Sequence, residues 1–513
     1  MSRLALLSVS DKTGIVELAR QLVEKFQFEI ISSGGTAKTL QDAGIAVTKV
    51  SDYTGSPEIL GGRVKTLHPR IHGGILARQD LSEDIADLEA NNIRPFDLVV
   101  VNLYPFEQTI AQPNVSIPEA IEKIDIGGPT LIRAAAKNYK YLTVLCSFTQ
   151  YDRYLNELES QSEISLEFRQ QMAGAAFAHT NSYDRAISTY FANLNSSEDL
   201  ADSYGIGGNK VQSLRYGENP HQPAAWYQTG KTASGWAAAN KLQGKELSYN
   251  NLVDLEAARR IITEFDPSEP AAAVLKHTNP CGAAVGSTLA EAYERAFNAD
   301  NVSAFGGIVA LNQPIDAATA QALTKTFLEC VVAPGCESEA REILKAKSKL
   351  RILILPDLAT GQPETIKAIA GGFLVQKSDD KIENPEDWQI ATDKQPTPEQ
   401  IAEMLFAQKL VKHVKSNAIL VSRDRTTLGI GAGQMNRVGS VKIALEQAGE
   451  KASGGVLASD GFFPFDDSVR TAAAAGISAI IQPGGSIRDK DSIAAANELG
   501  LVMVLSGTRH FLH

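Results

Sequence analysis

The first 150 residues alternate short apolar runs with amphipathic stretches, and turns rich in glycine, serine or threonine separate them. Residues 4–9 and 28–31 are expected to be buried strands, and residues 15–26 place apolar side chains at helical spacing. Further strands are expected at 98–103 and 141–146. This strand–helix alternation favours a parallel α/β sheet, in which ligands bind beyond the C-terminal ends of the strands.

The length of 513 residues predicts at least two domains. A polar, glycine-containing segment at 193–210 is the expected boundary, which gives domains 1–200 and 201–513. The second half is also mixed α/β, with strands expected at 271–275, 307–311 and 351–355. A polar segment at 376–400 is expected to divide it again, although no clear sequence repeat spans that divide.

The charge balance argues against a protein that coats duplex nucleic acid. Lys and Arg total 49 against 60 Asp and Glu, a net charge of -11, whereas such proteins present a broad basic face. Local cations can still hold a small anion. The four cysteines form no CxxC pair, which favours a reducing compartment over a disulfide scaffold. With neither a secretory signal nor a membrane span in the sequence, we expect a cytoplasmic protein.

Turns after the predicted N-terminal strands carry groups that suit an anionic ligand. Ser33-Gly34-Gly35-Thr36 follows a strand and opens a helix, so backbone N–H groups and hydroxyls can approach a phosphate. Lys12 lies in the equivalent turn after the first strand, and Asp125-Ile126-Gly127-Gly128 supplies another glycine-containing helix start. Each could be an ordinary turn, but their expected convergence at one sheet edge favours a shared phosphate site.

Other residues of this half could take part in chemistry. Arg63-Val64-Lys65-Thr66 concentrates polar groups without an amphipathic face, and its alternative is a solvated loop. Asn102 and Tyr104 follow a strand, where the tyrosine is either a crevice hydroxyl or a packed aromatic. Lys137, on the helix expected from Pro129, is either solvated or a proton-transfer group with a lowered pKa.

The second half contains a sharper pattern. Lys276-His277 ends the apolar strand AAAVL and precedes Thr-Asn-Pro-Cys-Gly, so His277 can be a general base and Lys276 can stabilise an oxyanion. Arg215 and Tyr216 combine a phosphate-binding cation with a stacking ring, although a polar loop without function is the alternative. Phe462 could stack on a heterocycle or belong to a core. A catalytic zinc ion is not expected, because Pro280-Cys281 is followed by no PCxxC and preceded by no HxE.

The chain resembles the AICAR transformylase/IMP cyclohydrolase family from end to end. The matching blocks are, in order, SVSDKTG, SGGTAKTL, GRVKTLHP, NLYPF, DIGGPTLIRAAAKN, RYGENPHQ, KHTNPCG, SAFGG, GIGAGQ, SDGFFPF and RHFLH. Two positions depart from some relatives. Leu512 stands where many carry a basic residue, and Glu329 stands where some carry Asp.

The resemblance implies two successive reactions of purine biosynthesis. The C-terminal half would transfer formyl from 10-formyltetrahydrofolate to the 5-amino group of AICAR, giving FAICAR, and the N-terminal half would close FAICAR to IMP with loss of water. The implied fold is a methylglyoxal-synthase-like domain followed by two cytidine-deaminase-like units without zinc. The resemblance also implies a homodimer and no tightly bound cofactor. Some relatives bind potassium, which the sequence leaves open here.

The resemblance gives roles to the candidate residues. In the cyclohydrolase, Lys137 would transfer protons, Lys65 would stabilise charge on the formyl oxygen, and Tyr104 and Asp125 would orient the substrate. The expected nucleotide-binding residues there are Ser10, Asp11, Lys12, Ser33, Gly34, Gly35, Thr36, Arg63, Val64, Thr66, Asn102 and Ile126.

In the transformylase, His277 would deprotonate the amine, Lys276 would stabilise the oxyanion, and Asn417 would position the formyl group. The expected nucleotide- and folate-binding residues are Arg215, Tyr216, Asn251, Gly306, Glu329, Arg437, Phe462, Arg509 and Phe511. Two alternatives stay open: a non-catalytic purine-nucleotide sensor on the same scaffold, and a zinc-dependent nucleobase deaminase.

Overall fold

The computed structural model describes residues 2–161, 163–194, 200, 202–230 and 233–513. The chain forms two compact units. Unit 1 comprises residues 1–208 and 229–232, and unit 2 comprises Asn209–Gln228 and Ala233–His513. Of the predicted boundary segment 193–210, residues 195–199 and 201 lie outside the described residues.

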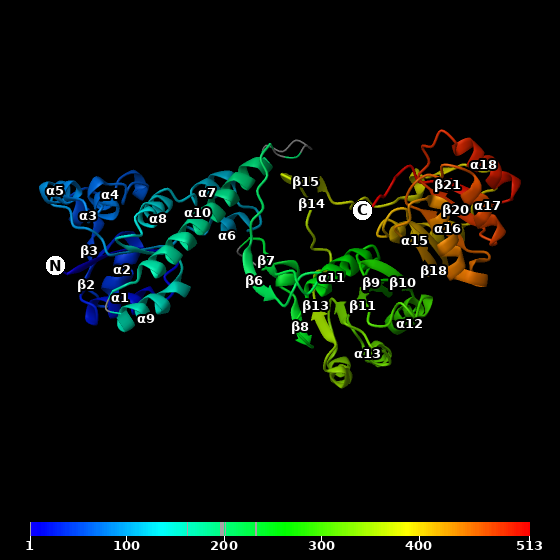
Figure 1. Ribbon diagram of the computed structural model, residues 1–513, viewed down its shortest axis with the longest axis horizontal. Helices are drawn as coiled ribbons and strands as arrows, with labels where there is room; N and C mark the ends of the chain where they lie inside the picture. The colour runs from blue at the N-terminus through cyan, green and yellow to red at the C-terminus, as the bar shows by residue number, and fades with distance from the viewer. Residues whose placement is uncertain (1, 162, 195–199, 201, 231–232) are drawn as a thin grey trace. The chain divides into compact units, whose positions relative to one another are not determined.

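Unit 1 is built on a five-stranded parallel sheet with strand order β3-β2-β1-β4-β5 (Figure 1). The strands are β1 (Arg3–Ser8), β2 (Phe28–Ser32), β3 (Thr48–Lys49), β4 (Leu98–Val101) and β5 (Thr143–Leu145). The predicted strands at 4–9, 28–31, 98–103 and 141–146 are thus confirmed, with ends shifted by up to two residues. The short edge strand β3 carries two exposed residues, which explains why its sequence has no apolar run.

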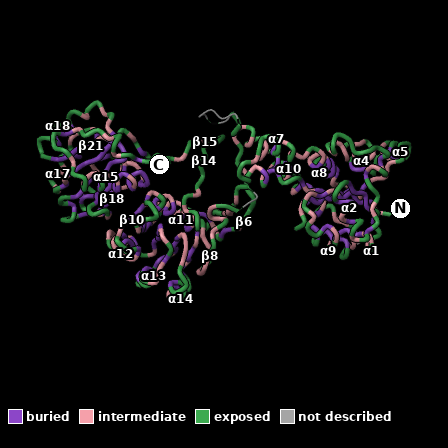
Figure 2. Tube along the Cα trace, turned by 180° about the vertical axis from the view of Figure 1, so that it is seen from behind, coloured by how far each residue is buried: buried purple, intermediate pink, exposed green. Residues whose placement is uncertain are grey.

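Helices cover both faces of this sheet. They are α1 (Ile15–Glu24), α2 (Gly34–Asp42), α3 (Val50–Thr54), α4 (Pro69–Leu76), α5 (Ser82–Ala90), α6 (Phe106–Ile110), α7 (Ile117–Ile121), α8 (Gly127–Lys137), α9 (Tyr151–Gln161) and α10 (Leu166–Leu194). Because side chains alternate across a strand, Leu4 and Leu6 pack with α8 and α10, whereas Ala5 and Leu7 pack with α1 and α9. Figure 2 shows buried chain in the interior of unit 1, between the labelled helices, whereas the edge strand β3 is exposed.

Unit 2 contains a mixed sheet of order β16-β21-β20-β19-β17-β18-β10-β9-β11-β12-β13-β8. Its strands are β8 (Asn240–Gln243), β9 (Ala271–Lys276), β10 (Asn279–Val285), β11 (Ile308–Leu311), β12 (Cys330–Ala333), β13 (Arg351–Ile354), β16 (Gln389–Ile390), β17 (Ile419–Arg423), β18 (Thr426–Gly431), β19 (Val456–Ser459), β20 (Ala479–Gln482) and β21 (Val502–Leu505). The predicted strands at 271–275, 307–311 and 351–355 are confirmed. Two separate hairpins complete the strands, β6 (Asn209–Leu214) with β7 (Ala224–Gln228) and β14 (Glu364–Ile369) with β15 (Gly372–Lys377).

The helices of unit 2 reveal an internal duplication. They are α11 (Tyr249–Ile262), α12 (Leu289–Ala299), α13 (Ala317–Thr324), α14 (Ser338–Leu344), α15 (Pro398–Val411), α16 (Arg437–Ala448), α17 (Asp467–Ala474) and α18 (Asp489–Glu498). The order β8-α11-β9-β10-α12-β11-α13-β12-α14-β13 recurs as β16-α15-β17-β18-α16-β19-α17-β20-α18-β21. The two repeats meet where β10 pairs antiparallel with β18, with Ala284 opposite Thr426.

One core is continuous across both repeats of unit 2. It contains Leu275 and Leu255 of the first repeat together with Leu410 and Leu420 of the second. The opposite face has a separate core for each repeat, under α12–α14 and under α16–α18. The predicted divide at 376–400 is not a bare linker, because it includes the end of β15 and the edge strand β16 of the second repeat. No helix among the described residues is long and apolar enough to cross a membrane.

Candidate active sites

A cavity of about 770 Å³ lies at the C-terminal ends of the strands of unit 1. Most of the predicted nucleotide-binding residues of this half line it, together with the first turn of α8. The lining residues that the sequence predicted are Ser10, Lys12, Ser33, Gly34, Gly35, Thr36, Arg63, Lys65, Thr66, Asn102, Tyr104, Asp125 and Ile126. Residues from five separate segments therefore converge at one sheet edge.

The start of α2 and Lys12 form one wall of the cavity. Ser33 is the N-cap of α2, and Thr36 Oγ1 accepts a hydrogen bond from Val9 N–H and donates one to Val9 O, both at 3.0 Å. These bonds fix the helix N-terminus beside the turn that follows β1. The Lys12 ammonium donates to the carbonyls of Val9 and Ser10, and burial lowers the pKa of Lys12 while Asp11 partly opposes that shift. A helix N-terminus beside an ammonium is suited to a phosphate.

Lys65 lies against the start of α2. Its Nζ is 3.5 Å from Glu58 Oε2, and a Cβ atom added to Gly34 would lie only 3.2 Å from that Nζ. A Cβ atom on Gly62 would lie 2.6 Å from Lys65 Cε. The two glycines, with φ of 50° and 89°, thus leave the space that the lysine side chain occupies.

Asp125 also lines the cavity, two residues before α8 begins. Its Oδ1 accepts a hydrogen bond from Gly128 N–H at 2.8 Å, and its own N–H donates to Tyr183 Oη at 2.9 Å. Burial raises the pKa of Asp125, while backbone hydrogen bonds from Gly128 and Tyr104 and the charge of Lys65 oppose the rise. Tyr104 is 42% exposed, so its ring borders the cavity and does not belong to the core.

Three predicted residues of this half are not among the cavity lining. Asp11 caps the turn before α1, accepting from Thr13 N–H at 2.9 Å, and Val64 forms a backbone bridge with Ile59. Lys137 is the exposed last residue of α8, whose first turn lines the cavity. At about 1.5 Å rise per residue, ten residues place Lys137 about 15 Å along the axis from Gly127. The helix thus carries Lys137 away from the cavity of its own chain, and its role in proton transfer stays a prediction.

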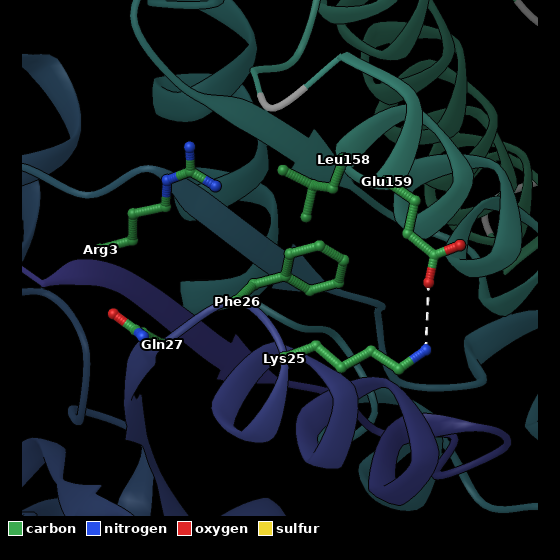
Figure 3. Close-up of a pocket in the computed structure, with 6 residues that line it drawn as sticks. All are labelled: Arg3, Lys25, Phe26, Gln27, Leu158 and Glu159. Carbon is green, nitrogen blue, oxygen red and sulfur yellow. Dashed lines mark hydrogen bonds and ion pairs between the residues drawn. The ribbon is translucent and has the colours of Figure 1, made fainter.

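A second hollow on unit 1 lies at the opposite edge of the sheet (Figure 3). Arg3 begins β1 and Gln27 precedes β2, so this hollow is at the N-terminal ends of the strands. Lys25 Nζ is paired with Glu159 Oε1 at 3.0 Å across it. The loops that carry the predicted site residues of unit 1 gather instead at the C-terminal edge.

In unit 2 the Lys276–His277 pair lies at the turn between β9 and β10. The register pairs Asn279 with Lys276, and the two turn residues His277 and Thr278 have φ of 52° and 65°. Lys276 Nζ donates to the carbonyls of Phe305 at 2.9 Å and Gly306 at 3.3 Å. An ammonium has three N–H donors, so a third remains for a substrate oxygen.

The second repeat contributes Asn417 to the same region. The neighbouring Lys415 N–H donates to Asn279 Oδ1 at 3.3 Å, which ties this segment to the β9–β10 hairpin. Asn417 Nδ2 donates to Gln434 O at 2.8 Å. The structure therefore places the segment that carries Asn417 beside the hairpin of Lys276 and His277, about 140 residues earlier in the chain.

Arg437 is buried next to the C-terminal tail. Its guanidinium is paired with Asp460 and donates to Ser459 Oγ at 3.2 Å. A Cβ atom on Gly461 would lie 2.5 Å from the Arg437 guanidinium and 2.7 Å from the Phe511 ring, so both side chains surround this glycine. A paired, buried Arg437 is better suited to fixing the tail than to binding a phosphate directly.

The remaining predicted residues of unit 2 have identifiable contacts. The guanidinium of Arg215 lies 5.4 Å from the Tyr216 ring centroid, and that of Arg509 lies 4.5 Å from the Phe511 centroid. Glu329 Oε2 is paired with Arg351 at 2.6 Å. Phe462 is partly exposed at 38%. The Asn251 side chain closes a capping box with Ser248 at the start of α11, and its substrate-binding role stays a prediction.

His510 is a buried residue that the sequence did not single out. Its Nδ1 is 2.6 Å from Asp379 Oδ2 and its Nε2 is 2.9 Å from Glu383 Oε1. Burial alone would lower the pKa of His510, but hydrogen bonds and charge from the two carboxylates outweigh it and raise the pKa to about 9. A protonated His510 thus anchors the tail that carries Arg509 and Phe511.

We expect His510→Gln to lower the stability of unit 2 in a pH-dependent way. The folded pKa of about 9 exceeds the ordinary 6.5, so the bound proton stabilises the fold fully below pH 6.5 and ceases to do so above pH 9. The difference in unfolding free energy from wild type should be about 3 kcal/mol at pH 6 and should shrink toward pH 10. Urea unfolding at several pH values measures it, with exposed His513→Gln as the control. A pH-independent difference would contradict this charge state.

Comparison with known proteins assigns the family. The chain matches the AICARFT/IMPCHase bienzyme family over residues 135–447 and the MGS-like domain over residues 14–130. Proteins named "Bifunctional purine biosynthesis protein PurH" from Rippkaea orientalis and Gloeothece citriformis are 73% and 72% identical to it, each over the full length of both chains. A solved structure described as "Crystal structure of ForH" aligns with 38% of this chain at 36% identity and a TM-score of 0.36.

The fold and the two clusters of polar residues define a two-unit α/β enzyme of nucleotide metabolism. The chain belongs to the AICARFT/IMPCHase bienzyme family. It is a bifunctional enzyme of purine biosynthesis that catalyses the last two steps to IMP, formyl transfer to AICAR and closure of FAICAR, and its formyl donor is a folate co-substrate. This assignment excludes the sensor and the deaminase as alternatives.

Proposed function

We propose that unit 1 closes FAICAR to IMP in the 770 Å³ cavity and that unit 2 transfers the formyl group at the β9–β10 turn. The observation that carries the proposal is the convergence of Lys12, Lys65 and Asp125 with the start of α2 at one sheet edge. Product analysis tests it: a variant damaged in the cavity should convert AICAR only as far as FAICAR.

In unit 1, the start of α2 and Lys12 would hold the phosphate of FAICAR. Lys65 would donate to the formyl oxygen as the carboxamide nitrogen attacks the formyl carbon, and Asp125 would accept a proton from that nitrogen. The proton on Asp125 would then pass to the hydroxyl, the carbon–oxygen bond would break to release water, and the former formamide nitrogen would return its proton to Lys65, which gives IMP. Because attack is intramolecular, orientation by the cavity would supply much of the rate.

In unit 2, the AICAR amine would attack the formyl carbon of 10-formyltetrahydrofolate. His277 would take the amine proton, and the free N–H of Lys276 would stabilise the tetrahedral oxyanion. Asn417 would orient the formyl group. Cleavage of the bond between the formyl carbon and the folate N10 then releases tetrahydrofolate, with a proton returned to that nitrogen.

We propose that a second copy of the chain supplies Lys137 to the cyclohydrolase cavity. Its ammonium does not line the cavity of its own chain, yet the family resemblance implies proton transfer by this lysine. Mixing Lys65→Met with Lys137→Ala chains tests the idea, because one site of a mixed dimer would then be intact. Cyclisation restored by mixing would support the proposal, and a fully active Lys137→Ala homodimer would contradict it.

A homodimer also agrees with the exposed β14–β15 hairpin. It forms its own two-stranded sheet, and Ile366, Ile369 and Leu374 are 42%, 50% and 57% exposed. Two strands alone are only marginally stable in water, so a covering surface is needed. Sedimentation of wild type and Leu374→Asp measures the assembly, and we expect the substitution to weaken it.

We propose that the enzyme is cytoplasmic and binds no cofactor tightly. The folate takes part as a co-substrate. Among the described residues, no group of three or more His, Cys, Asp or Glu side chains could hold a metal ion. Potassium prefers carbonyl and hydroxyl oxygens. Replacing potassium by sodium in the formyl-transfer assay would measure any requirement for it.

We expect Gly128→Ala to reduce cyclisation at least tenfold. The new Cβ atom would lie 2.6 Å from Asp125 Oδ2 and 2.6 Å from Leu103 Cδ2, so the carboxylate must move. The rate of IMP formation from added FAICAR measures the effect. Gly174→Ala in α10 is the control, because its Cβ atom would meet nothing within 4 Å and the rate should be unchanged.

A further inference from the structure

The duplicated fold of unit 2 contains two equivalent hairpin turns. His277 and Thr278 join β9 to β10 with φ of 52° and 65°, and Asp424 and Arg425 join β17 to β18 with φ of 55° and 51°. In each pair two successive non-glycine residues adopt the left-handed conformation. This conformation is unfavourable for such residues and persists only where surrounding contacts enforce it.

An acidic residue at the same place in each repeat supplies such a contact. Asp254 Oδ1 accepts a hydrogen bond from Thr278 N–H at 2.7 Å, and Glu403 Oε2 accepts one from Arg425 N–H at 2.7 Å. Asp254 is the sixth residue of α11 (Tyr249–Ile262), and Glu403 is the sixth residue of α15 (Pro398–Val411). Both repeats therefore use a helix carboxylate to hold the second residue of the turn.

The two turns carry different side chains. The first presents Lys276 and His277, whereas the equivalent positions of the second are Arg423 and Asp424. Burial raises the pKa of Asp254, while the Thr278 hydrogen bond and the charges of His277 and Lys276 oppose that rise. Burial raises the pKa of the Cys330 thiol, and the charge of Asp254 adds to that rise. Only Asp254 thus combines the backbone contact with proximity to the residues of formyl transfer.

We propose that Asp254 is a positioning residue for formyl transfer, which holds the His277–Thr278 turn through the Thr278 N–H and places a negative charge beside the Lys276–His277 pair. The inference rests on the proposed role of His277 as the base. An anion there favours the protonated imidazole and ammonium. Asp254 acts through these two residues and needs no contact with substrate.

Two substitutions separate the backbone contact from the charge. Asp254→Ala removes both, and we expect kcat for formyl transfer to fall about 10- to 100-fold, with KM for AICAR within about threefold of wild type. Asp254→Asn keeps an oxygen acceptor for Thr278 N–H. It should recover kcat to within about fivefold of wild type, while the acidic limb of the pH–rate profile moves to lower pH.

Glu403→Ala and Glu403→Gln are the matched controls, because their turn carries no reacting group. We expect both to keep formyl-transfer kcat within about twofold and all four variants to close FAICAR normally. Wild-type kcat in Asp254→Ala, an equal loss in Glu403→Ala, or an unmoved pH profile in Asp254→Asn would overturn the inference. If Asp254→Ala does not fold, the pH profile of Asp254→Asn decides. A fully active His277→Ala would instead refute the proposed base, whatever the Asp254 variants do.

Discussion

His277→Ala should lose formyl transfer by about 10³-fold while it still closes added FAICAR to IMP at the wild-type rate. The imidazole at the β9–β10 turn is the group that we propose takes the amine proton, and general-base catalysis contributes about 10²- to 10⁴-fold. Unit 1 forms a compact unit of its own, and His277 is not among the residues that line its cavity, so we expect cyclisation to be independent of this residue. Product analysis with AICAR and with FAICAR as alternative substrates measures both activities.

The duplicated fold supplies the control for this substitution. Asp424 occupies the position of His277 in the second repeat and has nearly the same backbone conformation, with φ of 55° against 52°. Asp424→Ala should therefore test the general effect of truncating a turn residue and should leave both activities intact. If His277→Ala transferred formyl normally, or if both variants lost it equally, a base at His277 would be untenable.

Lys65→Met should lower cyclisation by about 10²- to 10³-fold and cause FAICAR to accumulate from AICAR and the formyl donor. The cavity places the Lys65 ammonium beside Gly34 and within 3.5 Å of Glu58 Oε2, and Met keeps the length of the chain without the charge. Removal of one donor to a developing oxyanion typically costs this factor. The rate of IMP formation from FAICAR measures it.

A surface lysine of unit 1 provides the comparison for Lys65. Lys140 is paired with Asp80 at 2.6 Å and is not among the residues lining the cavity. Lys140→Met removes a charge of the same kind, and we expect cyclisation within about twofold of wild type. Equal losses in the two variants would mean that net charge, and not a donor in the cavity, controls the reaction.

The seven strands that were predicted in the two units could be found because each is a largely buried run of apolar residues. No repeated sequence indicates the duplication in unit 2, which only the family resemblance implied, since equivalent elements share only their burial pattern: β9 reads AAAVLK and β17 reads ILVSR. Many apolar sequences satisfy the same packing, so a repeated fold need not leave a repeated sequence. The edge strand β16 could not be predicted either, because it consists of two exposed residues within a polar segment and has no apolar run.

Most of the unit 1 site could be predicted because glycine-rich turns after parallel strands meet at one edge. The exceptions depend on tertiary distance. Lys137 follows the glycines of α8 in sequence, but the helix carries it away from the cavity. His510 lies in the RHFLH tail that carries the family resemblance. Its partners Asp379 and Glu383 are more than 120 residues earlier, so no local sequence pattern indicates the cluster. Asp254 is equally inconspicuous in sequence, because it is one of two acidic residues in a partly buried helix.

The most direct test of two independent active sites is a mixture of His277→Ala and Lys65→Met with AICAR and 10-formyltetrahydrofolate. Neither variant alone should make IMP at more than about 1% of the wild-type rate. In the mixture, FAICAR made by the Lys65→Met chains can diffuse to the intact cavities of the His277→Ala chains, so IMP should form. If the mixture made no more IMP than either variant alone, while each kept its remaining activity, the assignment of the two reactions to separate sites would be contradicted.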